Sequence, residues 1–324
     1  MEQINLDNEE FQKALQIIQF TRRSLFLTGK AGTGKSTFLR YISETTKKKH
    51  VILAHTGIAA INAGGSTLHS FFKLPFHPLL PNDTRYSVRN MRKTLRYTSE
   101  KCKLLREVEL IIIDEISMVR ADIIDFIDKV LRVYNRNMRE PFGGKQLLLV
   151  GDIYQLEPVV REEDRQLLAP FYHSQFFFDA KVFASLQLVS IELTKVYRQN
   201  NPTFINLLDH IRSSHVTTAD LEMLNRQVGA DIDTSDSSLS ITLSTRRDTV
   251  DYINSTRLAE LDGDATIFDG TIEGDFPENN LPSPLKLELK VGAQVLFVRN
   301  DKEKRWVNGT LGTVTGFSLD VEDS

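Results

Sequence analysis

The chain is poor in the residues that cross-link a protein or hold it in a membrane. Its 324 residues include a single cysteine, Cys102, which excludes an internal disulfide and fits a reducing compartment. No apolar run approaches the roughly 18 residues that a membrane-spanning helix needs. Residues 1–10, MEQINLDNEE, are polar and acidic, unlike the start of a signal or transit peptide. We therefore expect a globular protein without a membrane partner, in the bacterial cytoplasm or, for a eukaryotic chain, in the nucleus or mitochondrion.

A large net charge is also absent. The chain has 40 Lys and Arg and 43 Asp and Glu, so its formal net charge is −3. A nucleic-acid partner would therefore have to be bound by local positive charge. Residues 85–106 supply such charge: Glu100 is the one acidic residue there, and Tyr86 and Tyr97 are interleaved. The stretch fits a solvated helical face as well as a nucleic-acid contact. Its basic residues are Arg85, Arg89, Arg92, Lys93, Arg96, Lys101, Lys103 and Arg106.

Short apolar runs alternate with helical stretches along much of the chain. The runs are continuous, as in strands that are buried on both faces, and their alternation with helices predicts a parallel α/β sheet. The proline-rich segment 73–83 interrupts the pattern and is expected to lead into an insertion. A second α/β block follows residue 202, in which residues 240–261 predict a strand, a turn and a helix. The strands expected in the first block are residues 24–27, 50–55, 109–114, 146–152 and 187–193.

Residues 27–37, LTGKAGTGKST, contain the phosphate-binding pattern G-x-x-x-x-G-K-[ST] between an expected strand and an expected helix. Glycines let successive backbone N–H groups turn toward a phosphate, and the N-terminus of the following helix adds partial positive charge. Lys35 is expected to reach the β- and γ-phosphates of ATP, and the Ser36 hydroxyl to hold Mg²⁺. The predicted nucleotide-binding residues of this loop are Gly29, Ala31, Gly32, Thr33, Gly34, Lys35, Ser36 and Thr37.

Two further expected strands end in polar residues. IIIDEIS, residues 111–117, places Asp114 to hold Mg²⁺ and Glu115 to orient the attacking water. GDIYQLEPV, residues 151–159, places Gln155 where its amide can meet a γ-phosphate. Taken alone, a carboxylate pair at a strand end is a weak signal, and the second segment also fits a polar turn.

Residues 54–72, AHTGIAAINAGGSTLHSFF, combine small hydrogen-bond donors with aromatic rings, which suits a single nucleic-acid strand. Thr56, Gly57 and His69 are candidate phosphate contacts. Phe72 is a candidate base contact, although it fits a core position equally well. Arg198, in ELTKVYRQ, is a candidate γ-phosphate partner, although a lone arginine is more often in a surface ion pair.

These motifs, taken in order, resemble the PIF-one family of DNA helicases, in the 5′-to-3′ branch of helicase superfamily one. The RecD-type helicases are near relatives, and residues 122–152 look like the insertion that sets the PIF-one group apart. The resemblance extends from about residue 5 to residue 316 and implies a P-loop NTPase fold with two RecA-like motor domains, the second of them incomplete. It divides the chain into a first motor domain (1–72 and 107–190), an inserted wedge subdomain (73–106), a second motor domain (191–305) and the start of an SH3-like insertion (306–324).

The resemblance also implies roles for individual residues. Gln12, 17 residues before Gly29, matches the motif that reads adenine. Arg198 matches an arginine that contacts the γ-phosphate, and Thr56, Gly57 and His69 lie in a motif that touches single-stranded DNA. Lys35, Ser36, Asp114, Glu115 and Gln155 take the nucleotide roles given above. The wedge contributes Arg92 and Arg96 near the duplex junction.

Two substitutions and one absence depart from the family pattern. His55 and Glu157 stand where the family usually has proline. The family's later DNA-gripping motif and its final nucleotide-site arginine do not follow residue 316, so we expect a truncated chain. Nucleotide binding should survive this truncation, whereas efficient hydrolysis and translocation are left open.

The resemblance implies an enzyme: a helicase that uses ATP and Mg²⁺ to step 5′-to-3′ along single-stranded DNA. The sequence leaves the oligomeric state open, and we expect a monomer. The expected substrates of the helicase are duplex, forked or quadruplex DNA in replication, repair, recombination or telomere maintenance. One alternative is a nucleotide-gated module that binds single-stranded DNA without helicase activity. Another is a P-loop ATPase that acts on protein partners, against which the GD-x-x-Q motif and the second α/β block argue.

Overall fold

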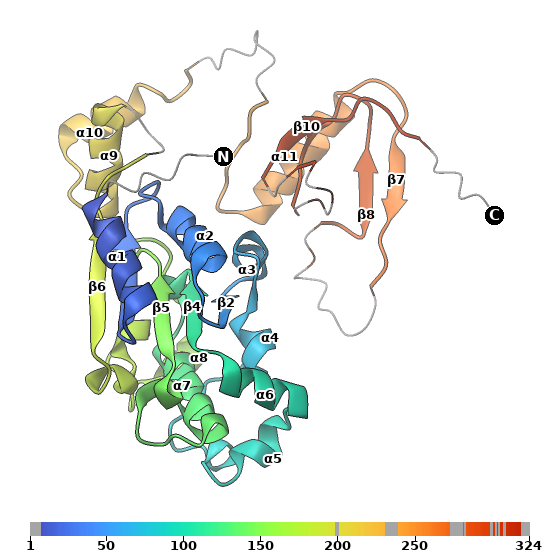
Figure 1. Ribbon diagram of the computed structural model, residues 1–324. Coiled ribbons are helices and arrows are strands. Elements are labelled where there is room, and N and C mark those ends of the chain that lie inside the picture. The colour runs from blue at the N-terminus through green and yellow to red at the C-terminus, as the bar shows by residue number, and fades with distance from the viewer. Residues whose placement is uncertain are drawn as a thin grey trace. The chain divides into compact units, whose positions relative to one another are not determined.

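The computed structural model describes residues 8–197, 201–230 and 239–272, and, toward the C-terminus, residues 281, 283–298, 301, 303, 305, 306 and 309–318. The chain forms two compact units, residues 1–228 and 229–324, which are considered separately below (Figure 1). None of the helices in the described ranges is both long enough and apolar enough to span a bilayer. The predicted boundary between two motor domains at residue 191 stays a prediction.

Unit 1 is built on a parallel sheet of six strands in the order β3-β2-β4-β5-β1-β6. All five strands expected from the apolar runs are present, and the short strand β3 was not predicted. The parallel α/β fold expected from the sequence is therefore confirmed here. The strands are β1 (Ser24–Gly29), β2 (His50–Ala54), β3 (Ser66–Thr67), β4 (Leu110–Asp114), β5 (Gln146–Val150) and β6 (Leu188–Leu193).

Alternate side chains of the central strands enter two separate cores, because successive residues of a strand point to opposite faces. Leu110 and Ile112 of β4 pack with α1 (Glu9–Phe20) and α2 (Lys35–Thr45). Ile111 and Ile113 pack on the other face, in the cluster that contains α7 (Ala121–Asn135). Unit 1 thus has helix, sheet and helix layers, which explains why its strands are apolar throughout.

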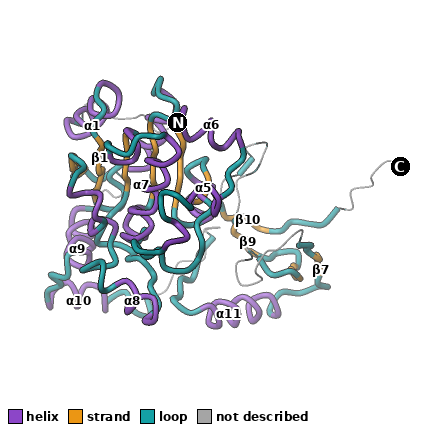
Figure 2. The backbone as a smooth tube through the Cα atoms, turned by 90° about the horizontal axis from the view of Figure 1, so that it is seen from below, coloured by secondary structure: helices purple, strands orange, loops and turns teal. Residues whose placement is uncertain are grey.

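Shorter helices complete unit 1. In both views α9 and α10 lie side by side (Figures 1 and 2), and the His210 side chain of α9 meets Asp220 of α10 at 2.9 Å. The remaining helices are α3 (Gly57–Asn62), α4 (Leu68–Phe72), α5 (Met91–Leu95), α6 (Ser99–Glu107), α8 (Glu162–Leu168), α9 (Pro202–Arg212) and α10 (Thr218–Asn225), with 3-10 turns at Thr84–Tyr86, Ile116–Met118, Pro141–Gly144, Phe177–Asp179 and Lys181–Ala184.

The inserted segment 73–106 shares the core of unit 1. Tyr86 packs edge-on against Phe126 of α7, with ring centroids 4.9 Å apart, and Tyr97 lies 4.7 Å from Tyr134. Leu95 of α5 is buried in the same cluster. The insertion is thereby held to α7, and the predicted wedge does not form a core of its own.

Unit 2 contains α11 (Arg247–Ala259) and two antiparallel strand pairs, β7–β8 and β9–β10. The strand predicted before α11 is wrong, because residues 239–246 form no regular strand. No parallel pairing occurs among the described residues of this unit, and the predicted second motor domain stays a prediction. The strands are β7 (Thr266–Asp269), β8 (Lys286–Leu289), β9 (Gln294–Leu296) and β10 (Leu311–Thr313).

Candidate nucleotide and DNA site

The predicted nucleotide motifs follow strands that are neighbours in the sheet. β1 leads into the phosphate-binding loop, the adjacent β5 leads into Gly151 and Asp152, and the next strand, β4, ends at Asp114. The carboxyl ends of parallel strands meet at one edge of the sheet, which is where ligands bind in open α/β folds. The strand order therefore brings together side chains that are more than 110 residues apart in the sequence.

The loop after β1 has the backbone that a phosphate cradle requires. Gly32 and Gly34 have φ angles of 77° and 96°, in the left-handed region that favours glycine. A Cβ on Gly29 would lie 2.5 Å from the carbonyl oxygen of Leu193, so a side chain is excluded there by backbone atoms. α2 begins at Lys35 without a side-chain cap at Gly34, which leaves the first helical N–H groups available to an anion.

Lys35 is held inside its own loop. Its Nζ donates to the carbonyl oxygens of Gly29, at 2.6 Å, and Lys30, at 3.0 Å. Burial lowers the pKa of Lys35, while the negative charges of Asp152 and Glu115 oppose this shift. The lysine thus lies near the predicted carboxylates Asp114 and Glu115 and near Asp152, which was not predicted, and it is half-buried, so that its charge is weakly screened.

Asp114 and Glu115 lie at the end of β4. Burial, together with the nearby Glu115 charge, raises the pKa of Asp114 to about 6. Glu115 has a φ of 51°, a left-handed conformation that costs a non-glycine residue roughly 1 kcal/mol, and its N–H donates to Asp114 Oδ1 at 3.0 Å. The bond from the Glu115 N–H fixes one oxygen of the Asp114 carboxylate at the end of the strand.

A magnesium site fits this arrangement. The described residues contain no cluster of three or more His, Cys, Asp or Glu side chains that could hold a metal ion alone. Mg²⁺ in nucleotide enzymes is usually held by one or two protein oxygens together with substrate phosphates and waters. Asp114 and the exposed Ser36 at the start of α2 offer oxygen ligands of that kind.

Gln155 belongs to a bonded network at the end of β5. Its Nε2 donates to Asp152 Oδ2 at 3.1 Å, and Asp152 is 1% exposed. Arg212 of α9 donates to the same carboxylate through Nε and Nη2. Neither Asp152 nor Arg212 was among the predicted site residues. The arginine is 60 residues from the aspartate and carries no motif of its own.

The N-terminal end of α1 lies beside the nucleotide loop. The Asn8 side chain donates to the Tyr197 hydroxyl at 3.3 Å, and the Tyr197 N–H donates to the carbonyl oxygen of Gly32 at 2.8 Å. Gln12 is one turn further along α1, and its predicted contact with adenine stays a prediction. Arg198, the predicted γ-phosphate partner, lies outside the described residues.

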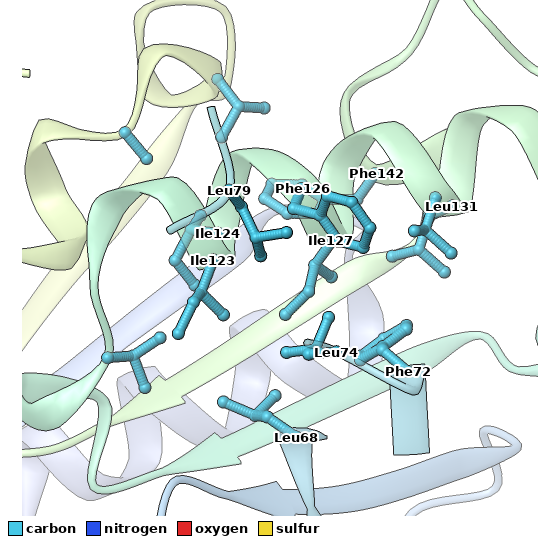
Figure 3. Close-up of a cluster of buried hydrophobic side chains, with 14 of the residues drawn as sticks. Leu68, Phe72, Leu74, Leu79, Ile123, Ile124, Phe126, Ile127, Leu131 and Phe142 are labelled. Carbon is cyan, nitrogen blue, oxygen red and sulfur yellow. The ribbon is translucent and has the colours of Figure 1, made fainter. Parts of the chain in front are cut away.

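The predicted DNA contacts lie around β2 and α4, and one of them is wrong. Thr56 and Gly57 follow β2, and His69 lies on α4. Phe72 is 0% exposed and packs among the leucine and isoleucine side chains of the main core, as Figure 3 shows. A ring in that position cannot stack on a nucleic-acid base, so Phe72 is a core residue.

Phe76, which sequence reasoning did not single out, provides an exposed ring instead. It is 88% exposed and stacks on His69, with ring centroids 5.2 Å apart and an interplanar angle of 9°. His55 packs edge-on behind His69 at 6.0 Å, and its buried Nδ1 has no hydrogen-bond partner among the described residues. The signal in the sequence was weak: an aromatic residue within a proline-rich loop.

Arg92 and Arg96, predicted to lie near a duplex junction, have different surroundings. Arg92 Nη2 donates to the carbonyl oxygen of Val133 at 2.9 Å, and its guanidinium lies 5.5 Å from the Tyr134 ring, so it ties the insertion to α7. Arg96 is exposed at the end of α5, and its Nε donates to the Lys93 carbonyl oxygen at 3.2 Å. Arg96 is therefore the better placed of the two to meet a ligand.

This chain is similar to known proteins both in sequence and in structure. A family model described as PIF1-like helicase matches residues 3–222, and a model of the 2B domain of DNA helicase Pif1 matches residues 277–317. The ATP-dependent DNA helicase PIF1 of Candida albicans is 34% identical over 97% of this chain and 35% of its own length. The chain thus spans about a third of that relative. The Pif1 helicase of Bdellovibrio bacteriovorus is 32% identical, over 98% of this chain and 69% of its own length.

Solved structures agree with this assignment. The crystal structure of Bacteroides sp. Pif1 in complex with ADP-AlF4 is 41% identical, with a TM-score of 0.79 over 96% of this chain and 70% of that one. The Pif1 helicase from Candida albicans is 32% identical, with a TM-score of 0.78 over 95% of this chain and 68% of that one. The nucleotide loop, the acidic strand ends and these matches agree, and the chain belongs to the PIF1-like helicase family.

Proposed function

We propose that this chain is the ATP-driven motor region of a DNA helicase that moves 5′-to-3′ on single-stranded DNA and unwinds duplex or structured DNA. The observation that carries the proposal is the meeting of Lys35 with Asp114, Glu115 and Asp152 at one edge of the sheet. Relatives solved with ADP-AlF4, with single-stranded DNA and at forked double-stranded DNA support it. The polarity, the use of quadruplex DNA and the roles in replication, repair, recombination and telomere maintenance are parts of the proposal that rest on family resemblance. The monomeric state and the cellular location are also proposals, and the location rests on composition alone.

In this proposal the loop between β1 and α2 binds the phosphates of ATP. Lys35 Nζ exchanges its two carbonyl partners for phosphate oxygens, which remain close to the same loop. Asp114 and Ser36 hold Mg²⁺, which neutralises charge on the phosphates when it is bound. Glu115 accepts a hydrogen bond from the attacking water and orients it, while Gln155 and Arg198 contact the γ-phosphate. Catalysis then rests mainly on positioning and electrostatics.

DNA binding is assigned to the surface around β2 and α4. Thr56 and Gly57 offer hydrogen-bond donors to the phosphate backbone, and the stacked rings of His69 and Phe76 offer a face for a base. Arg96 of the insertion supplies positive charge toward a duplex junction. These residues differ from those assigned to the nucleotide, so Lys35→Ala should remove nucleotide turnover and leave DNA binding largely intact.

The decisive experiment measures ATP turnover of this chain with and without single-stranded DNA, with Lys35→Ala as the control. We expect stimulation by DNA, and a loss of turnover of roughly 100-fold or more in Lys35→Ala, since a preorganised phosphate ligand is removed. Single-stranded DNA binding should persist in that variant. Failure of the parent chain to bind single-stranded DNA at low salt would contradict the proposal.

A second function, nucleotide-gated DNA binding without turnover, is favoured by one observation. Among the described residues of unit 2, Ala293 is the one buried hydrophobic side chain, so this unit has little core with which to transmit force. Tight binding of ATP and DNA with no turnover would support this second function for the chain as it stands.

A further inference from the structure

A buried ion pair joins α9 to the end of β5. Arg212 donates to Asp152 from Nε, at 3.2 and 2.9 Å, and from Nη2, at 2.9 Å. The Asp152 side chain is 0% exposed and that of Arg212 is 15% exposed. Two donors in a planar fork fix both the position and the rotation of a carboxylate, which a single ammonium group cannot do.

The fixed carboxylate of Asp152 in turn orients the side chain of Gln155. The carboxylate also accepts from the Tyr154 N–H, at 3.1 Å, and from Gln155 Nε2, at 3.1 Å. Burial by itself would raise the pKa of Asp152, but the hydrogen bonds from Arg212 and Tyr154 bring it below its ordinary value. Asp152 is therefore a charged acceptor. A carboxylate accepts only from donors, so the amide nitrogen of Gln155 must face it, and the amide has one orientation.

Arg212 contacts the same turn a second time. Its guanidinium lies 4.5 Å from the centre of the ring of Tyr154, which lies between Asp152 and Gln155 in the sequence. One turn earlier on α9, Asp209 forms an ion pair with Lys30 of the phosphate-binding loop, at 2.7 Å. A single helix face thus holds both loops that border the nucleotide site.

We propose that Arg212 is a positioning residue for recognition of the γ-phosphate, acting on Gln155 through the bidentate bond to Asp152. The inference rests on the proposed function, because it takes Gln155 as a γ-phosphate contact. With Arg212 in place, the carbonyl oxygen and the second N–H of Gln155 are presented to the ligand in a set orientation. Without it, the buried Asp152 charge loses its ion-pair partner, and the turn 151–155 must rearrange.

The test compares the affinities of each variant for ADP and for ADP with aluminium fluoride, which mimics the transferred phosphate, by displacement of a fluorescent ADP. In Arg212→Ala we expect the preference for the mimic over ADP to fall about 10- to 100-fold, since the sensing group is displaced. ADP affinity should stay within about twofold, because the loop backbone binds the α- and β-phosphates. Arg212→Lys keeps the positive charge but loses the planar fork of donors. Its preference for the mimic over ADP should therefore lie between those of the parent chain and Arg212→Ala.

A matched control removes a similar ion pair elsewhere in unit 1. Arg132 of α7 bonds Asp128 through Nε, at 2.9 and 2.8 Å, and its side chain is 18% exposed. Arg132→Ala should leave the preference for the mimic unchanged. Thermal unfolding of each variant shows whether it is folded, and Arg212→Lys serves if Arg212→Ala is not.

A double-mutant cycle separates positioning from general support of the fold. If Arg212 acts through Gln155, adding Arg212→Ala to Gln155→Ala should lower the preference for the mimic no further. Equal loss of affinity for ADP and the mimic, or additive losses in the cycle, would overturn the inference while leaving the proposed function intact. Failure of the parent chain to bind either nucleotide would overturn both.

Discussion

The two units of this chain bury their helices to very different extents. α7 of unit 1 spans 15 residues and buries side chains along its whole length, whereas α11 of unit 2 spans 13 residues and buries none. The sequence of α7 has apolar residues in adjacent pairs, such as Ile123–Ile124 and Phe126–Ile127. α11 has Val250, Tyr252 and Ile253 among polar residues, and Tyr252 is 71% exposed.

This difference shows where the chemistry can be held rigidly. The nucleotide residues of unit 1 follow strands that are packed on both faces, and a site on packed elements keeps its geometry to a fraction of an ångström. The described residues of unit 2 form two short antiparallel pairs and an exposed helix, a pattern associated with low local stability. We therefore expect the units to differ in stability, in response to mutation and in ligand contact.

The largest difference should appear in amide hydrogen exchange. Amides of β4 and β5 should exchange only through global opening of unit 1, with a free energy on the order of 5–15 kcal/mol. Amides of α11 should exchange through local opening that costs much less, because no buried side chain has to be exposed. Equal protection of β4 and α11 would show that the two units unfold as one.

A pair of phenylalanine substitutions tests the same contrast by stability. Phe177 is 1% exposed and packs against Phe26 at 5.3 Å, so Phe177→Ala should lower the free energy of unfolding by about 3–5 kcal/mol. Phe268 of β7 is 45% exposed, and Phe268→Ala should cost about 1 kcal/mol or less. Chemical denaturation of both variants, followed by circular dichroism, measures the two costs. Similar losses would mean that unit 2 has a core of comparable strength.

Unit 1 should also lose stability in acid through His55. Burial, with added repulsion from His69 and Arg120, lowers the pKa of His55 from 6.5 to about 4. The unfolded chain therefore binds a proton at His55 more tightly than the folded chain does. The contribution of neutral His55 to the free energy of unfolding is complete above pH 6.5 and is lost as the pH falls toward 4. It amounts to at most about 3 kcal/mol, since one pKa unit corresponds to about 1.4 kcal/mol.

His55→Phe keeps a ring against His69 and removes the titrating group. The free energy of unfolding of this variant, measured between pH 4 and 7, should change less steeply than that of the parent. The double variant His55→Phe/His69→Phe, measured in the same way, gives the part of the difference that arises from repulsion between the two imidazoles. An identical pH slope would show that His55 is solvated enough to titrate normally.

The smallest expected effect concerns DNA contact, which we assign to unit 1. Phe76→Ala should weaken single-stranded DNA binding by about 1–3 kcal/mol, the usual contribution of one stacked base. Phe20→Ala is the matched control, because Phe20 is another unit 1 ring that is 81% exposed. Fluorescence anisotropy at fixed salt compares the variants. A similar loss in both would argue against a specific role for the His69–Phe76 stack.

The sequence predicted most of unit 1 because its signals are local. The continuous apolar runs 109–114 and 146–152 contain β4 and β5. The pattern G-x-x-x-x-G-K-[ST] lies at the loop between β1 and α2. Phe72 shows the limit of such signals. In the five-residue helix α4, neighbouring Phe71 and Phe72 look equivalent in sequence, yet only contact with the sheet decides which one is fully buried.

The amino-acid sequence by itself determined the phosphate-binding loop, the acidic strand ends and the parallel α/β class, because glycine spacing and apolar runs act within a few residues of chain. Only the tertiary structure decided that Arg212 bonds Asp152, and that Phe76 rather than Phe72 presents its ring. Those partners are set by strand order and by which helix faces meet. Interactions of this kind join residues with no fixed spacing in sequence, so no local pattern specifies them.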